Sequence, residues 1–238
     1  MVMSCENEKF NPQNLSNGNV LFLILIVVAL FGALYFAVSQ SSYISAGSQG
    51  NESGNIKAAQ INIFPTVVRS QILRMIAQNT ALENLEFNPP SDFASLSNPD
   101  IGVFHPSRGT PYSRADPGVM ANEQQGEWYF NRHFEIANIG SSSAGNIDGN
   151  DIVAFLPGIK QNICLRANQE NAVDTIPSIS DSGYLTDAME LLDSSYLPPA
   201  GENDIGDSVL TELAGKQFGC FEEQNTGTYI YYFALIEL

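Results

Sequence analysis

Basic residues, histidine and cysteine are all scarce in this chain. Only 10 of its 238 residues are Lys or Arg, against 26 Asp and Glu, which gives a formal net charge of −16. A surface this acidic repels phosphate backbones, so the sequence predicts no nucleic-acid partner. The same charge repels anionic lipid headgroups, which predicts that a folded domain would stand off a membrane surface rather than lie on it.

Motifs of catalysis are missing as well. The chain has no G-x-S-x-G elbow, P-loop, H-E-x-x-H or C-x-x-C. Of the two histidines, His133 has Glu135 two residues later on a predicted strand, so the two form a candidate acid–base or metal pair. The alternative is an exposed pair of strand residues. We therefore predict no enzyme, no catalytic residues and no cofactor.

Two turns and one aromatic segment are further candidates for binding. Asp148 and Asp151 belong to an oxygen-rich turn that could hold calcium, but the turn lacks the twelve-residue loop and its terminal Glu. The acidic turn at 202–207 is similar. We therefore predict no metal site, with Asp148 and Asp151 as the remaining candidates. Trp128, Tyr129 and Phe130 favour core packing, with a sugar-stacking platform as the alternative.

The three cysteines divide around a hydrophobic run. Cys5 precedes the run, whereas Cys164 and Cys220 follow it. If a membrane separates them, the outer pair can oxidise while Cys5 stays a thiol. We predict a Cys164–Cys220 disulfide, which would contribute on the order of 4 kcal/mol by loop entropy. Two free buried cysteines are the alternative.

The hydrophobic run from Val20 to Val38 has no charged side chain. As a helix it would extend about 29 Å, close to the thickness of the bilayer hydrocarbon. It predicts a single transmembrane helix. The short preceding tail and the late cysteine pair favour an N-terminus on the cytoplasmic side. A cleaved secretory signal, with Ala37-Val38-Ser39 as its cleavage site, is the alternative.

Gly18 directly precedes this run, and the layout resembles a type IV prepilin. The resemblance implies cleavage by a prepilin peptidase between Gly18 and Asn19, and other pilin-like subunits as partners. Leu23 stands where major pilins carry Glu as the fifth mature residue, which resembles the tip-type minor pseudopilins. The chain also resembles uncharacterised alphaproteobacterial envelope proteins in this opening, at LEFNPPSDF and near its C-terminal end.

The rest of the chain reads as one domain after a linker. The predicted parts are a cytoplasmic leader or tail (1–18), a transmembrane helix (19–39), a linker or helix extension (40–55) and a non-cytoplasmic globular domain (56–238). Hydrophobic periodicity within the domain predicts an amphipathic helix inside 56–82, with Val68, Ile72, Met75 and Ile76 on one face. It also predicts helices at 151–165 and 186–192, and strands at 128–136, 216–221 and 228–238. Asn225-Thr226-Gly227 predicts a hairpin turn between the last two strands.

These elements predict an α+β fold in which the amphipathic helix packs on an antiparallel sheet. Together with the resemblance, they predict a pilin-like, minor pseudopilin-type structural subunit of a cell-envelope filament or secretion apparatus. It would be a single-pass protein of the inner membrane, with the lipid bilayer as a partner and its C-terminal domain in the periplasm or outside the cell. The alternative is a membrane-tethered, adhesin-like binding module that does not polymerise.

Overall fold

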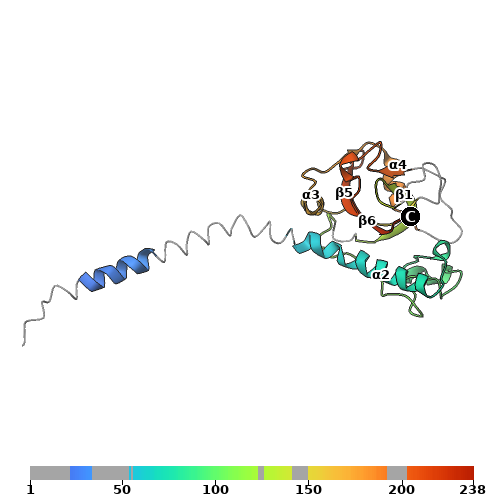
Figure 1. Cartoon of the computed structure of the whole chain (residues 1–238), viewed down its shortest axis with the longest axis horizontal. Coiled ribbons are helices and arrows are strands. Elements are labelled where there is room, and N and C mark those ends of the chain that lie inside the picture. Colours follow the sequence, from blue (N-terminus) through green and yellow to red (C-terminus); the bar gives the residue numbers. More distant parts are fainter. Residues whose placement is uncertain (1–21, 34–53, 55, 123–125, 141–149, 192–202) are drawn as a thin grey trace, which may run out of the picture. The chain divides into compact units, whose positions relative to one another are not determined.

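The computed structural model describes residues 22–33, 54, 56–122, 126–140, 150–191 and 203–238. The chain divides into two compact units, Met1–Gly50 and Asn51–Leu238. The described part of the first unit is a helix over residues 22–33. The second unit contains every strand and the remaining described helices, and Figure 1 shows its arrangement.

The prediction of a transmembrane helix over 19–39 is wrong. None of the described helices combines the length and the apolar character needed to cross a membrane. The description of the chain as a single-pass transmembrane protein is corrected accordingly. Residues 19–21 and 34–39 lie outside the described residues.

A six-stranded mixed sheet forms the centre of the second unit, with strand order β3-β5-β6-β2-β1-β4. The four central strands pair antiparallel, as predicted, but the short edge strands β3 and β4 pair parallel to their neighbours. The predicted purely antiparallel sheet is therefore corrected at both edges. The strands are β1 (Tyr129–Ile136), β2 (Asp151–Pro157), β3 (Ser178–Ile179), β4 (Asn203–Ile205), β5 (Phe218–Glu223) and β6 (Thr228–Ile236).

Helices cover both faces of this sheet. One face packs against α2 and α3 in one hydrophobic cluster, and the other packs against α4 in a second cluster. Because both faces are covered, the central strands are buried on both sides. The helices are α2 (Ile63–Ala77), α3 (Gln161–Glu170) and α4 (Ser182–Ala188), with 3-10 turns η1 (Leu82–Asn84), η2 (Pro90–Ser95) and η4 (Thr211–Leu213).

The amphipathic pattern of α2 matches its packing on the sheet. Val68, Ile72 and Met75 are completely buried, at the spacing that places them on one face of a helix. Ile76, which we also expected on this face, is 36 % exposed. Arg69 points away from the core and pairs with Glu237 at 3.2 Å. The predicted helix packed on a sheet is thus confirmed, with shorter bounds.

The helix predicted over 151–165 is instead a strand followed by a helix. All residues of β2 except the last are buried. A strand covered on both faces is apolar at successive positions, so its sequence loses the alternation that identifies a strand. The apolar residues therefore matched a helical stripe by coincidence. Pro157 and Gly158 end β2, and the true helix α3 begins at Gln161.

The Cys164–Cys220 disulfide predicted from the sequence is present, and it links α3 to β5. Both cysteines are completely buried. Asn168, one turn along α3, donates from Nδ2 to the carbonyls of Thr175 and Cys220 and accepts from the Cys220 N–H through Oδ1. Covalent and hydrogen-bonded links thus fix α3 on the sheet at the same place.

The hairpin predicted between β5 and β6 is also confirmed. Gly227 takes a positive φ of 66° in its turn, a conformation that costs glycine little. The buried Glu223 carboxylate accepts from the N–H groups of Asn225 and Thr226 and from the Thr226 hydroxyl. Desolvation raises the pKa of Glu223, but these hydrogen bonds outweigh it and leave the pKa below its ordinary value.

Candidate functional site

The predicted processing and metal residues divide into those the structure describes and those it does not. Gly18, Asn19 and Asp148 lie outside the described residues. Asp151 is the first residue of β2 and is buried. Within the described ranges, no three or more His, Cys, Asp and Glu side chains gather as a metal site would require.

The Asp151 carboxylate holds backbone groups instead. One oxygen accepts from the Ile136 N–H at 2.9 Å and the other from the Leu238 N–H at 3.1 Å. The side chain therefore links the end of β1 to the C-terminal end of the chain. Burial raises the pKa of Asp151 to about 6, the two N–H donors oppose the rise, and the charges of Glu135 and Glu237 add to it.

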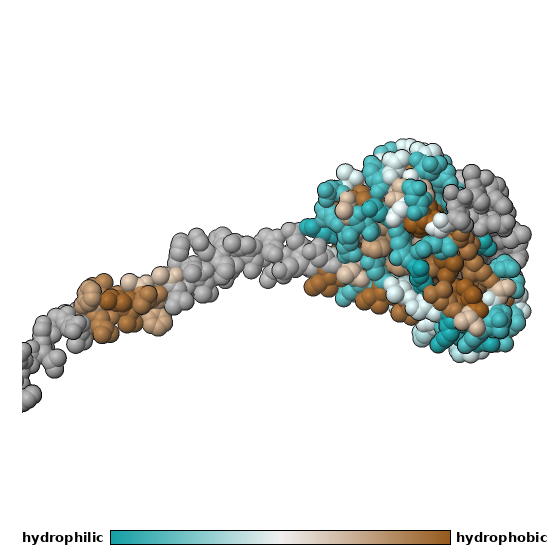
Figure 2. Space-filling view, in the orientation of Figure 1, coloured by the Kyte–Doolittle hydropathy of each residue, from teal (hydrophilic) through white to brown (hydrophobic). Residues whose placement is uncertain are grey.

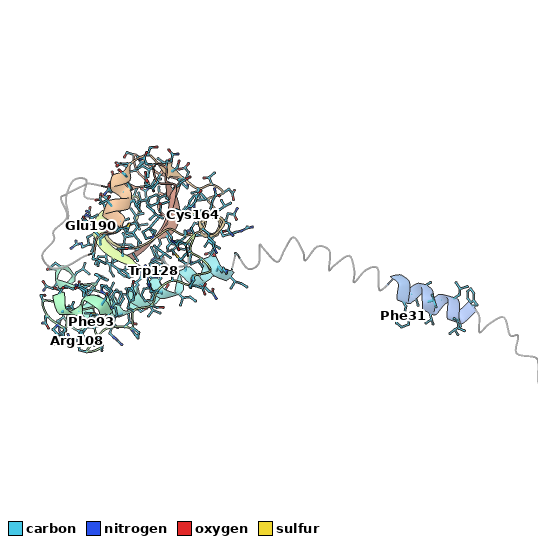
Figure 3. All side chains as sticks on the ribbon, turned by 180° about the vertical axis from the view of Figure 1, so that it is seen from behind. Phe31, Phe93, Arg108, Trp128, Cys164 and Glu190 are labelled. Atoms are coloured by element: carbon cyan, nitrogen blue, oxygen red, sulfur yellow. A yellow bond between two sulfur atoms is a disulfide. The ribbon has the colours of Figure 1, made fainter. Side chains whose placement is uncertain are left out.

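His133 pairs with a residue that the sequence did not point to. Its Nε2 lies 3.0 Å from a carboxylate oxygen of Glu190, just beyond α4, and the histidine is 3 % exposed. The register of β1 shifts between Asn131 and Phe134, which interrupts the two-residue alternation that the predicted His133–Glu135 pair relied on. The observed contact ties α4 to β1. Glu190 is labelled at this place in Figure 3.

The aromatic segment at the start of β1 is divided between the core and a cleft. Trp128 is 3 % exposed and Phe130 is fully buried, and Phe130 stacks on Phe87 with ring centroids 5.1 Å apart. Figure 3 shows Trp128 between α2 and the sheet. Core packing is therefore confirmed for these two residues. Tyr129 is only half-buried and lines the cleft.

A cleft of about 790 Å³ lies where β1 begins, β2 ends and β6 begins. Its volume falls within the range of about 300–1,000 Å³ that is typical of small-molecule sites. The cleft is lined by Tyr129 and Tyr229, by the start of α3 and by the apolar end of α4. The lining residues are Arg114, Ala121, Asn122, Gly126, Glu127, Tyr129, Pro157, Gly158, Ile159, Lys160, Gln161, Leu185, Met189, Gly227, Thr228 and Tyr229.

The polar groups of the cleft suit hydrogen bonding. Partial burial raises the pKa of Tyr129 and of Tyr229, with nearby Glu127 adding to the rise at Tyr129, so both phenols are neutral at physiological pH. Arg114 pairs with Glu127 at 2.9 Å, and both side chains are more than half exposed. Such an exposed pair is weak, so either member can turn toward a ligand.

The sequence pointed to one wall of this cleft and missed the others. Tyr129 belonged to the aromatic candidate segment, whereas Tyr229 was assigned only to a strand and Lys160 to the interior of a helix. These residues come together because the ends of β1, β2 and β6 are neighbours in the sheet. A proline and glycine at 157–158, placed after an apolar run, are the local signal that a strand ends there.

Comparisons of the chain with protein families, with curated proteins and with solved structures find no match.

Proposed function

We propose that the Asn51–Leu238 unit is an extracytoplasmic binding module whose cleft takes a small carbohydrate. The observation that carries this proposal is the cleft of about 790 Å³ with half-buried Tyr129 and Tyr229 in its lining. The Cys164–Cys220 bridge supports an oxidising compartment, where such crosslinks persist.

The lining of the cleft matches the surface of a sugar ring. A pyranose has apolar C–H faces, which pack on aromatic rings, and a rim of hydroxyl groups, which need donors and acceptors. Tyr129, Leu185 and Met189 offer apolar surface, and the side chains of Asn122 and Gln161 lie in the same lining. An amide side chain both donates and accepts, as a sugar hydroxyl does.

Removing a tyrosine ring is expected to weaken sugar binding. The Tyr129→Ala and Tyr229→Ala variants should each raise the dissociation constant of a binding disaccharide about tenfold, since an aromatic contact is worth about 0.5–1.5 kcal/mol beyond its area. Neutral disaccharides (maltose, cellobiose and diacetylchitobiose) would be titrated into ¹⁵N-labelled protein. The shifted amides should map to the cleft lining.

The control variant is Leu73→Ala, which truncates an apolar side chain that is 51 % exposed on α2 and outside the cleft. It should bind like the wild type, and circular dichroism would check that all three variants fold. Amide shifts that spread evenly over the surface, or tyrosine variants that bind with unchanged affinity, would contradict the carbohydrate site.

We propose as a second candidate that the domain assembles with copies of itself in a pilin-like manner. The supporting observation is the outer side of α2, where Ile63, Val67 and Leu73 are 61 %, 45 % and 51 % exposed. Figure 2 shows hydrophobic side chains along the outer edge of this helix. A groove of about 510 Å³, lined by Val67, Arg74 and residues 109–111, adjoins it. Exposed apolar side chains that gather on one side of a helix are a feature of protein–protein contact sites.

Charge favours a second copy as the occupant of this surface. The helix α2 has no acidic residue and two arginines, of which Arg69 already pairs with Glu237, in a chain whose net charge is −16. The α2 surface of one copy is thus complementary to the acidic surface of the next. A contact between two different surfaces is heterologous, and repeated contacts of this kind build open filaments.

Acidic substitutions on α2 are expected to abolish this association. The Ile63→Asp and Val67→Asp double variant should weaken self-association more than tenfold, because it removes apolar contact and adds like charge. Sedimentation velocity over a range of protein concentrations would measure the change. Met189→Asp, at a 42 % exposed apolar position outside α2, is the matched control. A wild type that stays monomeric at millimolar concentration would refute self-assembly through α2.

A further inference from the structure

Two of the chain's few lysines converge on one carbonyl oxygen beside the cleft. The Lys160 Nζ donates to the Gly118 carbonyl at 2.9 Å, and the Lys57 Nζ donates to the same oxygen at 3.3 Å. Two nitrogens that share one oxygen at these distances are separated by no more than about 6 Å, so their charges repel each other. Both lysines are half-buried, and they come from segments about a hundred residues apart.

Neither ammonium group forms an ion pair within the described part of the chain. The carboxylate of Asp116 is on the same turn, where one of its oxygens accepts from the Gly118 N–H at 2.6 Å. The same Asp116 oxygen and the Lys57 Nζ each lie 2.7 Å from the point where a Cβ on Gly118 would stand, so they are at most about 5.4 Å apart and Asp116 offsets part of the Lys57 charge. One carbonyl oxygen carries only a partial charge and cannot neutralise both ammonium groups.

We propose that Lys57 and Lys160 bind one oxyanion, a carboxylate or a phosphate group, at the margin of the cleft. A single oxyanion has enough lone pairs to accept from both ammonium groups while it cancels their repulsion. Both side chains and Gly118 remain partly accessible to solvent, so an anion can reach them.

The position of Lys160 connects this anion site to the carbohydrate site. Lys160 is itself part of the cleft lining, next to Gln161 and on the same cleft as Tyr229. One ligand can therefore place a ring against the tyrosines and its acidic group on the lysines. This extension rests on the proposed carbohydrate function and makes its ligand an acidic sugar, such as a uronic acid or a sugar phosphate.

The anion site can be tested without the natural ligand. Inorganic phosphate and galacturonate would be titrated separately into ¹⁵N-labelled full-length protein at low ionic strength. We expect saturable shifts of the amides around residues 118 and 160 for both probes. The Lys57→Gln and Lys160→Gln variants should each raise the dissociation constant at least tenfold, and added chloride should weaken binding in the wild type.

Lys216→Gln is the matched control, because Lys216 is also a half-buried lysine but lies two residues before β5, outside the cleft lining. It should bind both probes like the wild type. If the two lysines serve only to hold the Gly118 turn, their variants will melt lower but phosphate will not stabilise even the wild type. That outcome, or unchanged affinity in the two glutamine variants, would overturn the anion site.

Failure of the anion site and failure of the carbohydrate site are distinguishable. Neutral disaccharides that bind through the tyrosines while phosphate and galacturonate add nothing would refute only the anion site. Phosphate that binds through the lysines while neutral disaccharides do not bind would refute only the carbohydrate site. Galacturonate that binds more tightly than either galactose or phosphate would support one joined site, provided that both the tyrosine variants and the lysine variants bind it more weakly.

Discussion

Removing the Cys164–Cys220 bridge is expected to lower the free energy of unfolding by about 4 kcal/mol. The bridge closes a loop of 56 residues, and a crosslink across a loop of this length restricts the unfolded chain by about that amount. The double variant Cys164→Ala with Cys220→Ala avoids leaving a thiol in the core. Urea unfolding followed by circular dichroism would measure the loss, as a lower midpoint at an unchanged native spectrum.

Reducing the disulfide of the wild type should cause the same loss of stability, but the reduction should occur only after the chain unfolds. Both cysteines are completely buried, so a reductant reaches the bridge slowly in the native state and quickly in urea. Cys5→Ala is the control, because it removes a thiol that does not belong to the bridge. A double variant whose stability falls by less than about 1 kcal/mol would mean that Asn168 and the α3 packing fix this region without the crosslink.

Lowering the pH from 7 to 4 is expected to stabilise the protein through Asp151 by up to about 3 kcal/mol. Its folded-state pKa of about 6 lies above the value of 3.8 for an unburied carboxyl. The folded state therefore binds the proton more tightly between these values, and the stabilisation is complete below pH 3.8 and is lost as the pH rises through 6. The difference of about two between the folded and unfolded pKa values sets the size of this stabilisation.

Comparison with Asp151→Asn isolates this effect from the other carboxyl groups. The amide removes the charge, but its NH₂ group cannot accept from the second of the two backbone N–H groups, so the variant should be less stable than the wild type at pH 4 and should recover up to about 3 kcal/mol relative to it by pH 7. Asp92→Asn is a control in which the stability difference from the wild type should change with pH in the opposite direction, because hydrogen bonds from Ser95 and Asn88 lower the pKa of Asp92. Wild type should gain stability over that variant as the pH rises. A ¹³C titration that places the Asp151 pKa near 4 would contradict the prediction.

The two expected results concern separate contacts of the same domain. The crosslink stabilises α3 against β5, and protonation of Asp151 relieves the cost of burying its charge where it links the ends of β1 and β6. The cleft lies at the other ends of these strands, where β1 and β6 begin. The expected pH effect is therefore one on stability, and sugar binding should change little between pH 5 and 7.

The sequence by itself determined the elements whose signals are local. The stripe of Val68, Ile72 and Met75 predicted the helix that packs on the sheet, and Asn225-Thr226-Gly227 predicted the hairpin. Cysteine number and position predicted the disulfide. Each of these signals depends on neighbouring residues or on a single chemical pairing, and so it can be recognised before the chain is folded.

Only the tertiary structure decided the rest. Residues 151–157 form a strand because β6 and β1 flank them and both faces are covered, which no local pattern specifies. His133 meets Glu190 rather than Glu135 because α4 packs over β1 and the strand is irregular there. The lysines at 57 and 160 converge on one carbonyl for the same kind of reason: contacts between distant segments depend on how the elements pack, and hydrophobic periodicity does not encode that packing.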